Sequence, residues 1–256
     1  MEINNKLTAI IITKNEEKMI EDALKSLKFA DEILVVDTGS FDKTIYIAKK
    51  YKAKIVKYTS GESFSDWRNK GLAEAKGNWV LYVDADERIP NALAGEISNI
   101  LKTKSEGAFA IPRKNIVLGR ELLHGGWYPD YVKRLFSVNV LTQWTGDLHE
   151  EPVFSGKLLH LENSMLHIKH ETFSEMLIKT NKWSQIEAKL MFDANHPPMN
   201  TVRFVSAMWR EFWSRMVLRN AYLDGKVGVI FSIYQVFSRF VSYAKLWEMQ
   251  NESSNI

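Results

Sequence analysis

The chain has 256 residues, of which 45% are hydrophobic and 25% charged, a balance that predicts one sizeable globular core with a modest appendage and excludes a disordered chain. It has 0 cysteines, which excludes disulfides, thiolate metal sites and a cysteine nucleophile, and favours a reducing compartment such as the cytosol. The net charge of +3 is too small to indicate nucleic-acid binding, and polar residues 1–6 lack the order of a secretory signal.

Short apolar runs recur through the first half of the sequence. Each is bounded by polar residues or glycine, as expected for a buried strand. The predicted strands are Leu7–Ile12, Glu32–Val36, Lys54–Val56 and Trp79–Val83.

Helical spacing appears between these runs. One apolar stripe consists of Ile20, Ala23, Leu24 and Leu27, and a second begins with Ile45, Ala48 and Tyr51. Ser40 and Asp42 precede the second stripe and are candidate N-caps. Strands alternating with helices predict an α/β fold with a mostly parallel nucleotide-binding sheet flanked by helices. Ligands bind such sheets beyond the carboxyl ends of the strands.

The pattern changes twice further along the chain. Residues 107–170 contain shorter strands and loops rich in Gly, His and Trp, which we interpret as an acceptor-binding, active-site half beside a nucleotide-sugar half at 1–106. Residues 171–256 are helical, and Pro197-Pro198 divides them into two parts. We therefore expect a catalytic domain over 1–170 and a C-terminal helical region over 171–256.

Asp84 and Asp86 directly follow the strand predicted at 79–83. A turn at the end of a buried strand can aim both carboxylates at one cation. Mg²⁺ and Mn²⁺ prefer oxygen ligands and typically bind through one or two carboxylates plus substrate phosphates. A D-x-D sequence also occurs in solvated turns, but the apolar strand before it favours a metal site.

Polar residues follow or precede other predicted strands. Asp37 comes directly after the second strand and either hydrogen bonds to a base or ribose, or caps the next helix. Arg68 and Asn69 either neutralise phosphate or hold Asp84, unless they form an ordinary surface salt bridge. The sequence leaves these alternatives open.

Motifs in a characteristic order carry a family resemblance. They are Ile10-Ile11-Ile12-Thr13-Lys14-Asn15-Glu16, Val35-Val36-Asp37-Thr38-Gly39-Ser40, Arg68-Asn69 and Asp84-Ala85-Asp86. In this order they resemble family 2 glycosyltransferases of the GT-A fold. Four distal motifs resemble the lipopolysaccharide-core β-1,4-glucosyltransferase group within that family: Gly125 to Asp130, Arg134-Leu135-Phe136, His149-Glu150 and Tyr222-Leu223-Asp224-Gly225.

The resemblance, which covers nearly the whole chain, implies an inverting transferase that adds a single sugar from a nucleotide-sugar donor. It implies UDP-glucose as donor and a lipid-linked saccharide, a heptose of the lipopolysaccharide inner core, as acceptor. Residues implied to serve the donor and its metal are Thr13, Asn15, Glu16, Asp37, Arg68, Asn69, Asp84 and Asp86. The sequence departs from the general family at Ile12, where proline is usual, and at Thr38, where a second carboxylate is usual. The Q-x-x-R-W signature of processive synthases is absent.

Sugar transfer also requires a carboxylate that accepts the proton of the incoming hydroxyl. The candidates are Glu150, Asp147, Glu151 and Asp130. We favour Glu150, with Asp147 as the second choice, because the resembling group also keeps a His-Glu pair at this point. The alternative is that Glu150 is a solvated loop acid.

Histidines and aromatic residues complete the predicted site. His149, His167 and His170 either serve the metal or phosphate, or pack in the core. We interpret His170 as a residue of a closing loop and as a metal ligand beside Asp84 and Asp86. The predicted acceptor-side residues are Trp127, Tyr128, Asp130 and His149. The two aromatic residues either stack on a sugar or belong to the core.

Residues 203–219 have the pattern of a basic amphipathic helix. Its apolar stripe consists of Phe204, Val205, Met208, Trp209, Phe212, Trp213, Met216 and Val217, and its cations are Arg203, Arg210, Arg215 and Arg219. The stripe either lies on an anionic membrane surface or packs on the catalytic domain. Lys226 and Arg239 bracket an uncharged span too short to cross a bilayer, so we expect a peripheral protein on the inner face of the cytoplasmic membrane.

Three other functions fit parts of the sequence. A phosphatase with Asp84 as nucleophile is disfavoured, because Glu87 follows Asp86 and the motif lies on the fourth strand. A nucleotidyltransferase would release pyrophosphate in place of a nucleoside diphosphate. A non-catalytic nucleotide-sugar-binding membrane protein would bind the donor without turnover.

Overall fold

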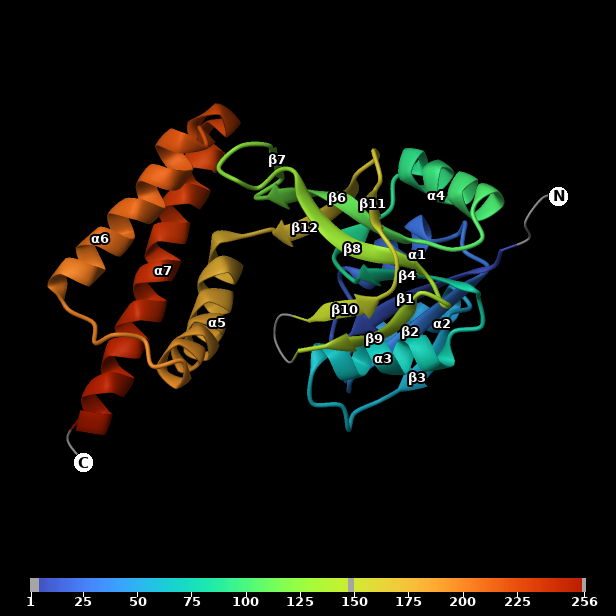
Figure 1. Cartoon of the computed structure of the whole chain (residues 1–256), viewed down its shortest axis with the longest axis horizontal. Helices are drawn as coiled ribbons and strands as arrows, with labels where there is room; N and C mark the ends of the chain where they lie inside the picture. The colour runs from blue at the N-terminus through green and yellow to red at the C-terminus, as the bar shows by residue number, and fades with distance from the viewer. Residues whose placement is uncertain (1–4, 147–149, 255–256) are drawn as a thin grey trace. The chain divides into compact units, whose positions relative to one another are not determined.

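The computed structural model describes residues 5–146 and 150–254 of the chain (Figure 1). These residues divide into two compact units, one made of residues up to 113 with 130–167, the other of 114–129 with residues from 168 onward. The expected domain boundary at 170 lies close to the observed change at 167. Residues 114–129, which we expected in the catalytic domain, group with the C-terminal helices.

A parallel sheet of four strands forms the centre of the first unit. The strands are β1 (Leu7–Thr13), β2 (Glu32–Asp37), β3 (Lys54–Lys57) and β4 (Trp79–Asp84). Their order in the sheet is β3-β2-β1-β4, so β2 and β3 lie on one side of β1, and β4 lies on its other side. All four predicted strands are confirmed, each one residue longer at its carboxyl end. Thr13 pairs with Asp37 and Ile12 with Asp84, which brings these strand ends to one edge.

Further strands continue this sheet beyond β4. They are β5 (Glu87–Arg88), β6 (Ala108–Val117), β7 (Arg120–Leu122), β8 (Asp130–Ser137), β11 (Leu158–His160) and β12 (Met165–His170). Strand β8 runs antiparallel to both β4 and β6. A separate antiparallel hairpin contains β9 (Leu141–Thr145) and β10 (Glu151–Phe154).

Helices cover both faces of the sheet, as predicted. Helices α1 (Ile20–Ser26), α2 (Thr44–Lys50) and α4 (Asn91–Thr103) contribute to one core cluster. Helix α3 (Phe64–Glu74) packs with the β9–β10 hairpin on the other face. The predicted stripe of α1 is fully buried, which anchors this helix against the sheet.

The start of α2 differs in part from the prediction. The Asp42 carboxylate accepts a hydrogen bond from the Thr44 amide at 2.9 Å, so Asp42 satisfies an amide of the first turn. The Ser40 hydroxyl instead accepts from the Asn15 amide at 3.0 Å. Ser40 therefore joins the loops after β1 and β2 and does not cap α2.

The second unit is mainly helical. It contains α5 (Phe173–Asp193), α6 (Thr201–Phe212), a π-helical turn at Trp213–Leu218, a 3₁₀ turn at Ala221–Asp224 and α7 (Gly225–Ser254). Helices α5 and α6 both pack against α7 (Figure 1). The Pro197-Pro198 pair lies between α5 and α6, which confirms the predicted break.

Asp224, from one of the distal motifs, holds a loop of the second unit. Its buried carboxylate accepts hydrogen bonds from the amides of Leu123 and His124 at 3.0 and 2.8 Å, and lies 2.7 Å from His124 Nδ1. These contacts satisfy loop amides that have no strand partner. The motif therefore has a structural role within this unit.

Candidate active site

The first part of the site is the carboxyl edge of β1 and β2. The Thr13 hydroxyl is buried there and has no hydrogen-bond partner within the described residues. The Asp37 carboxylate accepts a hydrogen bond from the Ser40 amide at 2.9 Å, which holds the turn after β2. A buried hydroxyl without a partner is costly unless a ligand satisfies it, so this edge suits a polar ligand.

The loop after β1 is tied to the loop after β2. Asn15 has a left-handed backbone with φ 58°, and its side-chain oxygen accepts from the Phe41 amide at 2.9 Å. The Glu16 amide donates to the Thr44 hydroxyl at 2.7 Å. Thr13, Asn15 and Glu16 thus lie in one segment that is hydrogen-bonded to the loop after β2, beside Asp37; their role in a nucleotide pocket stays a prediction.

Arg68 of α3 connects two acids of the site. Its Nε donates to Glu150 Oε1 at 3.0 Å, and its Nη2 lies 3.3 Å from Asp84 Oδ1. The guanidinium is buried and stacks 4.8 Å from the centre of the Trp144 ring. A surface salt bridge is therefore wrong for Arg68, while its predicted contact with Asp84 is confirmed.

Asn69 faces a different partner. Its amide nitrogen donates to the Trp144 carbonyl at 2.9 Å, and its side-chain oxygen accepts from the Trp144 amide at 2.7 Å. The Asn69 side chain therefore satisfies both backbone groups of Trp144 on β9, as a neighbouring strand would. Asn69 therefore fixes the hairpin to α3 and, in this structure, does not turn toward Asp84.

A continuous chain of alternating charges extends from Arg68 across the sheet. Arg134 of β8 contacts Asp84 and lies 3.1 Å from Glu87. Arg113 of β6 lies 3.2 Å from Glu87 and 2.8 Å from Asp130. In spatial order the chain is Asp130, Arg113, Glu87, Arg134, Asp84, Arg68 and Glu150. Glu87, Arg113 and Arg134 were not predicted as site residues, although the Arg134-Leu135-Phe136 motif and the acid directly after the D-x-D motif were visible in the sequence.

The arginines control the charge of Asp84. Burial by itself would raise the pKa of this carboxyl, but the charges of Arg134 and Arg68 outweigh burial and hold its pKa well below the usual range. Burial would likewise lower the pKa of Arg134, and the charges of Asp84 and Glu87 raise it instead. Asp84 is therefore ionised throughout the physiological pH range.

Glu87→Gln is expected to lower the free energy of unfolding by about 2–3 kcal/mol, because it removes the fully buried carboxylate that Arg113 and Arg134 share, while Asp130 and Asp84 remain as their other partners. Glu87 is 0% exposed and also accepts from the Asp84 amide at 2.9 Å. Denaturant unfolding measures the change. As a matched control, Glu121→Gln removes the half-exposed Lys114–Glu121 pair and should cost under about 1 kcal/mol. Equal losses in the two variants would contradict a special role for Glu87.

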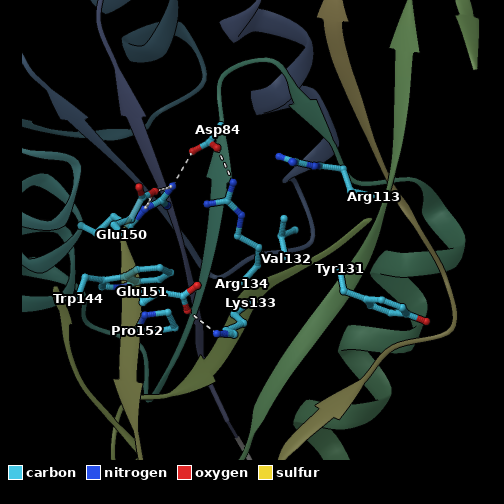
Figure 2. Close-up of a pocket in the computed structure, with 11 residues that line it drawn as sticks. Asp84, Arg113, Tyr131, Val132, Lys133, Arg134, Trp144, Glu150, Glu151 and Pro152 are labelled. Atoms are coloured by element: carbon cyan, nitrogen blue, oxygen red, sulfur yellow. Dashed lines mark hydrogen bonds and ion pairs between the residues drawn. The ribbon is translucent and has the colours of Figure 1, made fainter. Parts of the chain in front are cut away.

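A polar pocket of about 380 Å³ opens beside these alternating charged side chains (Figure 2). Its wall consists of Arg68, Asp84, Arg113, Tyr131, Val132, Lys133, Arg134, Trp144, Glu150, Glu151 and Pro152. Among the candidate bases, Glu150 faces Arg68, while Glu151 pairs with Lys133 and Asp130 with Arg113. Asp147 and His149 lie outside the described residues. Glu150 is thus the candidate base that the structure joins to Asp84 through one side chain.

The predicted metal ligands are arranged differently from the expectation. Asp86 is partly exposed, and the imidazole beside it is that of His167, whose Nε2 lies 3.4 Å from Asp86 Oδ2. His170 belongs to the second unit, where its ring packs 5.9 Å from Phe231 and 6.2 Å from Tyr234. No three His, Asp or Glu side chains gather as a metal-binding group in the part of the chain that the structure describes. The sequence could not separate His167 from His170, because both lie on β12.

The predicted acceptor-side aromatics lie in the second unit. The Trp127 ring packs 4.8 Å from Phe231, with the Arg215 guanidinium 4.3 Å from its centre. Trp127 therefore packs, partly buried, against a core cluster of the second unit, and its contact with a sugar stays a prediction. Tyr128 belongs to the same segment, whereas Asp130 lies in the first unit beside Arg113.

Comparisons with known proteins agree with this architecture. Residues 8–134 match the family described as Glycosyl transferase family 2. An uncharacterized glycosyltransferase of Rickettsia bellii is 29% identical, over 96% of this chain and 88% of its own length. The lipopolysaccharide core biosynthesis glycosyltransferase LpsC of Rhizobium meliloti is 24% identical, over 94% of this chain and 92% of its own length.

The crystal structure of S. aureus TarS in complex with UDP-GlcNAc is 16% identical, with a TM-score of 0.48 over 92% of this chain and 80% of that one. The family match includes β1, β2, Arg68 and the D-x-D turn, and the relatives extend through the helices. Glycosyl transfer therefore replaces the phosphatase and nucleotidyltransferase interpretations. The chain contains a glycosyltransferase family 2 domain at residues 8–134, has the GT-A fold and is a nucleotide-sugar-dependent enzyme.

Proposed function

We propose that this enzyme transfers one glucose from UDP-glucose, with inversion, to a lipid-linked saccharide of the lipopolysaccharide inner core at the inner face of the cytoplasmic membrane. The observation that carries the proposal is the position of Arg68, which contacts both Asp84 and Glu150. Asp84 lies at the carboxyl edge of strands β1, β2 and β4, which we call the donor edge, and Glu150 lies in the pocket. The similarity to LpsC supports a lipopolysaccharide core acceptor. The missing processive signature supports a single addition.

The residues of the donor edge suit a uridine nucleotide and its ribose. We assign Asp37 to binding of the base and Asp84 to binding of the ribose. The buried Thr13 hydroxyl and the loop that contains Asn15 and Glu16 would contact the rest of the nucleoside. Asp84 is held in its ionised form, so it can accept hydrogen bonds from ribose hydroxyls. Because Arg134 and Arg68 hold this carboxylate, its direction is fixed before the donor binds.

The charges of the site favour a divalent cation, Mg²⁺ or Mn²⁺. The alternating chain contains four carboxylates and three guanidinium groups, so it has no excess positive charge for a diphosphate. Asp86 offers a partly exposed carboxylate with the His167 imidazole beside it, a donor set that fits such an ion when phosphate oxygens complete it. When bound, the ion would stabilise the negative charge of the leaving diphosphate.

Glu150 is our candidate for the general base. Its carboxylate would accept the proton of the acceptor hydroxyl as the bond to the anomeric carbon forms. In the structure Arg68 occupies this carboxylate with a short ion pair of 2.9 Å. We infer that the donor phosphates compete for Arg68, which would leave Glu150 free to receive the proton only when the donor is in place.

A donor screen tests the proposed function. UDP-, GDP- and ADP-sugars are incubated with Mg²⁺ or Mn²⁺ and a lipid-linked core saccharide, and the released products are identified. UDP-glucose should be consumed fastest, with release of UDP and gain of one glucose by the acceptor. Pyrophosphate as the product, or donor binding without turnover on any acceptor, would contradict glycosyl transfer by this site.

A further inference from the structure

An apolar face remains exposed on the second unit. Of the twelve residues of α6, all of them described, only Ala207 is buried. Val205 is 64% exposed and Trp209 59% exposed, and Trp213 in the π-helical turn continues the same stripe. Because most large apolar side chains of a folded domain are buried, this face requires a partner.

Helix α7 extends this face. An apolar groove of about 480 Å³ is lined by α6 and α7, and its residues are Phe204, Val205, Met208, Trp209, Phe212, Val236 and Phe240. Further exposed apolar side chains on α7 are Ile230, Ile233 and Phe237. The two helices therefore present one shared apolar surface, which we call the α6–α7 face.

The charge of this region identifies the partner. Residues 195–247 contain seven basic and two acidic residues, whereas the rest of the chain contains 27 basic and 29 acidic residues. Arg203 and Arg210 are exposed on α6 outside the apolar stripe, and Arg203 Nη1 also donates to the Pro198 carbonyl at 2.8 Å. Positive charge beside an apolar stripe with tryptophans is typical of helices that bind an anionic membrane surface.

We propose that the α6–α7 face docks on an anionic phospholipid bilayer, with both helices in the plane of the membrane. Val205, Trp209 and Trp213 insert among the acyl chains, and Arg203 and Arg210 contact phosphate headgroups. This interface rests on the proposed function only in that the acceptor is lipid-linked. Arg215 was expected to contribute to headgroup binding, but it donates to the Gly125 carbonyl at 3.1 Å and covers Trp127.

Contacts on the opposite side of α7 argue against a membrane span. Among the described residues one helix, Ala221–Glu252, is long and apolar enough to cross a bilayer. However, the Ser242 hydroxyl on α7 donates to Glu187 at 2.6 Å, and Lys245 donates to the Asn181 carbonyl at 2.6 Å. Crossing the bilayer would carry these charged partners on α5 and α7 into the hydrocarbon. Docking in the plane leaves them in water.

Flotation of the full chain with vesicles tests the proposal. At low salt the protein should bind vesicles of phosphatidylcholine with phosphatidylglycerol, and bind much less to phosphatidylcholine alone. The Val205→Ser/Trp209→Ser variant should lower the partition coefficient by about tenfold or more. Arg203→Glu/Arg210→Glu should lower binding to anionic vesicles by roughly fivefold or more for each arginine.

Tyr46→Ser is the matched control, because Tyr46 is an exposed aromatic residue, 61% accessible, on α2 of the other unit. It should bind vesicles like the unchanged chain, and circular dichroism verifies the folding of each variant. Release of UDP without the lipid acceptor should be unchanged in the Val205→Ser/Trp209→Ser variant. UDP release without vesicle binding would overturn docking alone, whereas vesicle binding without any sugar transfer would overturn the proposed function alone.

Two other results would also overturn in-plane docking. A concentration-dependent dimer in solution, lost in Val205→Ser/Trp209→Ser and accompanied by no vesicle binding, would assign the α6–α7 face to a second copy of the chain. Resistance of the bound protein to alkaline carbonate extraction would instead indicate that α7 spans the bilayer.

Discussion

Asp86→Asn is expected to reduce sugar transfer by roughly 10³-fold, because it removes the carboxylate assigned to the divalent cation and therefore weakens stabilisation of the leaving diphosphate. Asp86 contributes little to the apolar core, since its carboxylate is partly exposed and contacts the His167 imidazole. The fold should consequently be unchanged by circular dichroism. Initial rates measured across a Mn²⁺ titration should show a large loss of apparent metal affinity.

Asp22→Ala provides the comparison for this variant, since Asp22 is an exposed acid of α1 paired with Lys25. Its metal titration should coincide with that of the unchanged enzyme. His167→Ala should weaken the metal response in the same direction as Asp86→Asn, whereas His170→Ala should act through packing with Phe231. Full activity of the unchanged enzyme after chelation of divalent ions would contradict the role assigned to Asp86.

Glu150→Gln is expected to lower turnover by about 10²-fold or more while leaving donor affinity nearly unchanged. The amide keeps the size of the side chain and one acceptor for Arg68, but it cannot take the proton of the acceptor hydroxyl at neutral pH. Steady-state rates with saturating acceptor, together with UDP binding by calorimetry, separate the two quantities.

Glu151→Gln is the neighbouring control, because its carboxylate pairs with Lys133 at the pocket rim. It should keep most of the activity. If Glu150→Gln were near normal and Asp147→Asn severely impaired, the base would be Asp147. A loss of donor binding equal to the loss of turnover would instead make Glu150 a positioning residue for Arg68.

The nucleotide-sugar half follows closely from local sequence signals. Strands such as Leu7–Thr13 and Trp79–Asp84 are buried apolar runs, and polar residues end them where parallel strands share an edge. That geometry predicts Thr13, Asp37 and Asp84 as neighbours without any knowledge of long-range packing. The register of β1 with β2 and β4 confirms it.

The alternating charge chain did not follow from the sequence. Glu87, Arg113 and Arg134 are separated by 26 and 21 positions, and they meet only because β8 lies antiparallel between β4 and β6. No local pattern specifies that arrangement. The role of Asn69 was hidden for the same reason, since its partner is the backbone of Trp144, 75 residues away.

In the helical region the sequence predicted the helices but not the contacts of their individual side chains. Its amphipathic pattern was evident, but the pattern could not separate the arginines that face solvent from Arg215, whose guanidinium turns inward to Trp127. It also could not distinguish a sugar-stacking Trp127 from a core residue, because aromatic side chains serve both purposes. The contacts with Phe231 and Arg215 show how the Trp127 ring packs, which no sequence pattern specifies.

A crystal structure of the enzyme with UDP and Mn²⁺ would locate the metal, the uracil and the Arg68 guanidinium in one experiment. Anomalous scattering should place one Mn²⁺ within about 2.2 Å of an Asp86 carboxylate oxygen and next to the diphosphate. The uracil should lie near Asp37, and the Arg68 guanidinium should have moved from Glu150 to a phosphate. Mn²⁺ bound away from Asp86, or UDP bound outside the β1–β4 edge with the Arg68–Glu150 pair intact, would contradict the account.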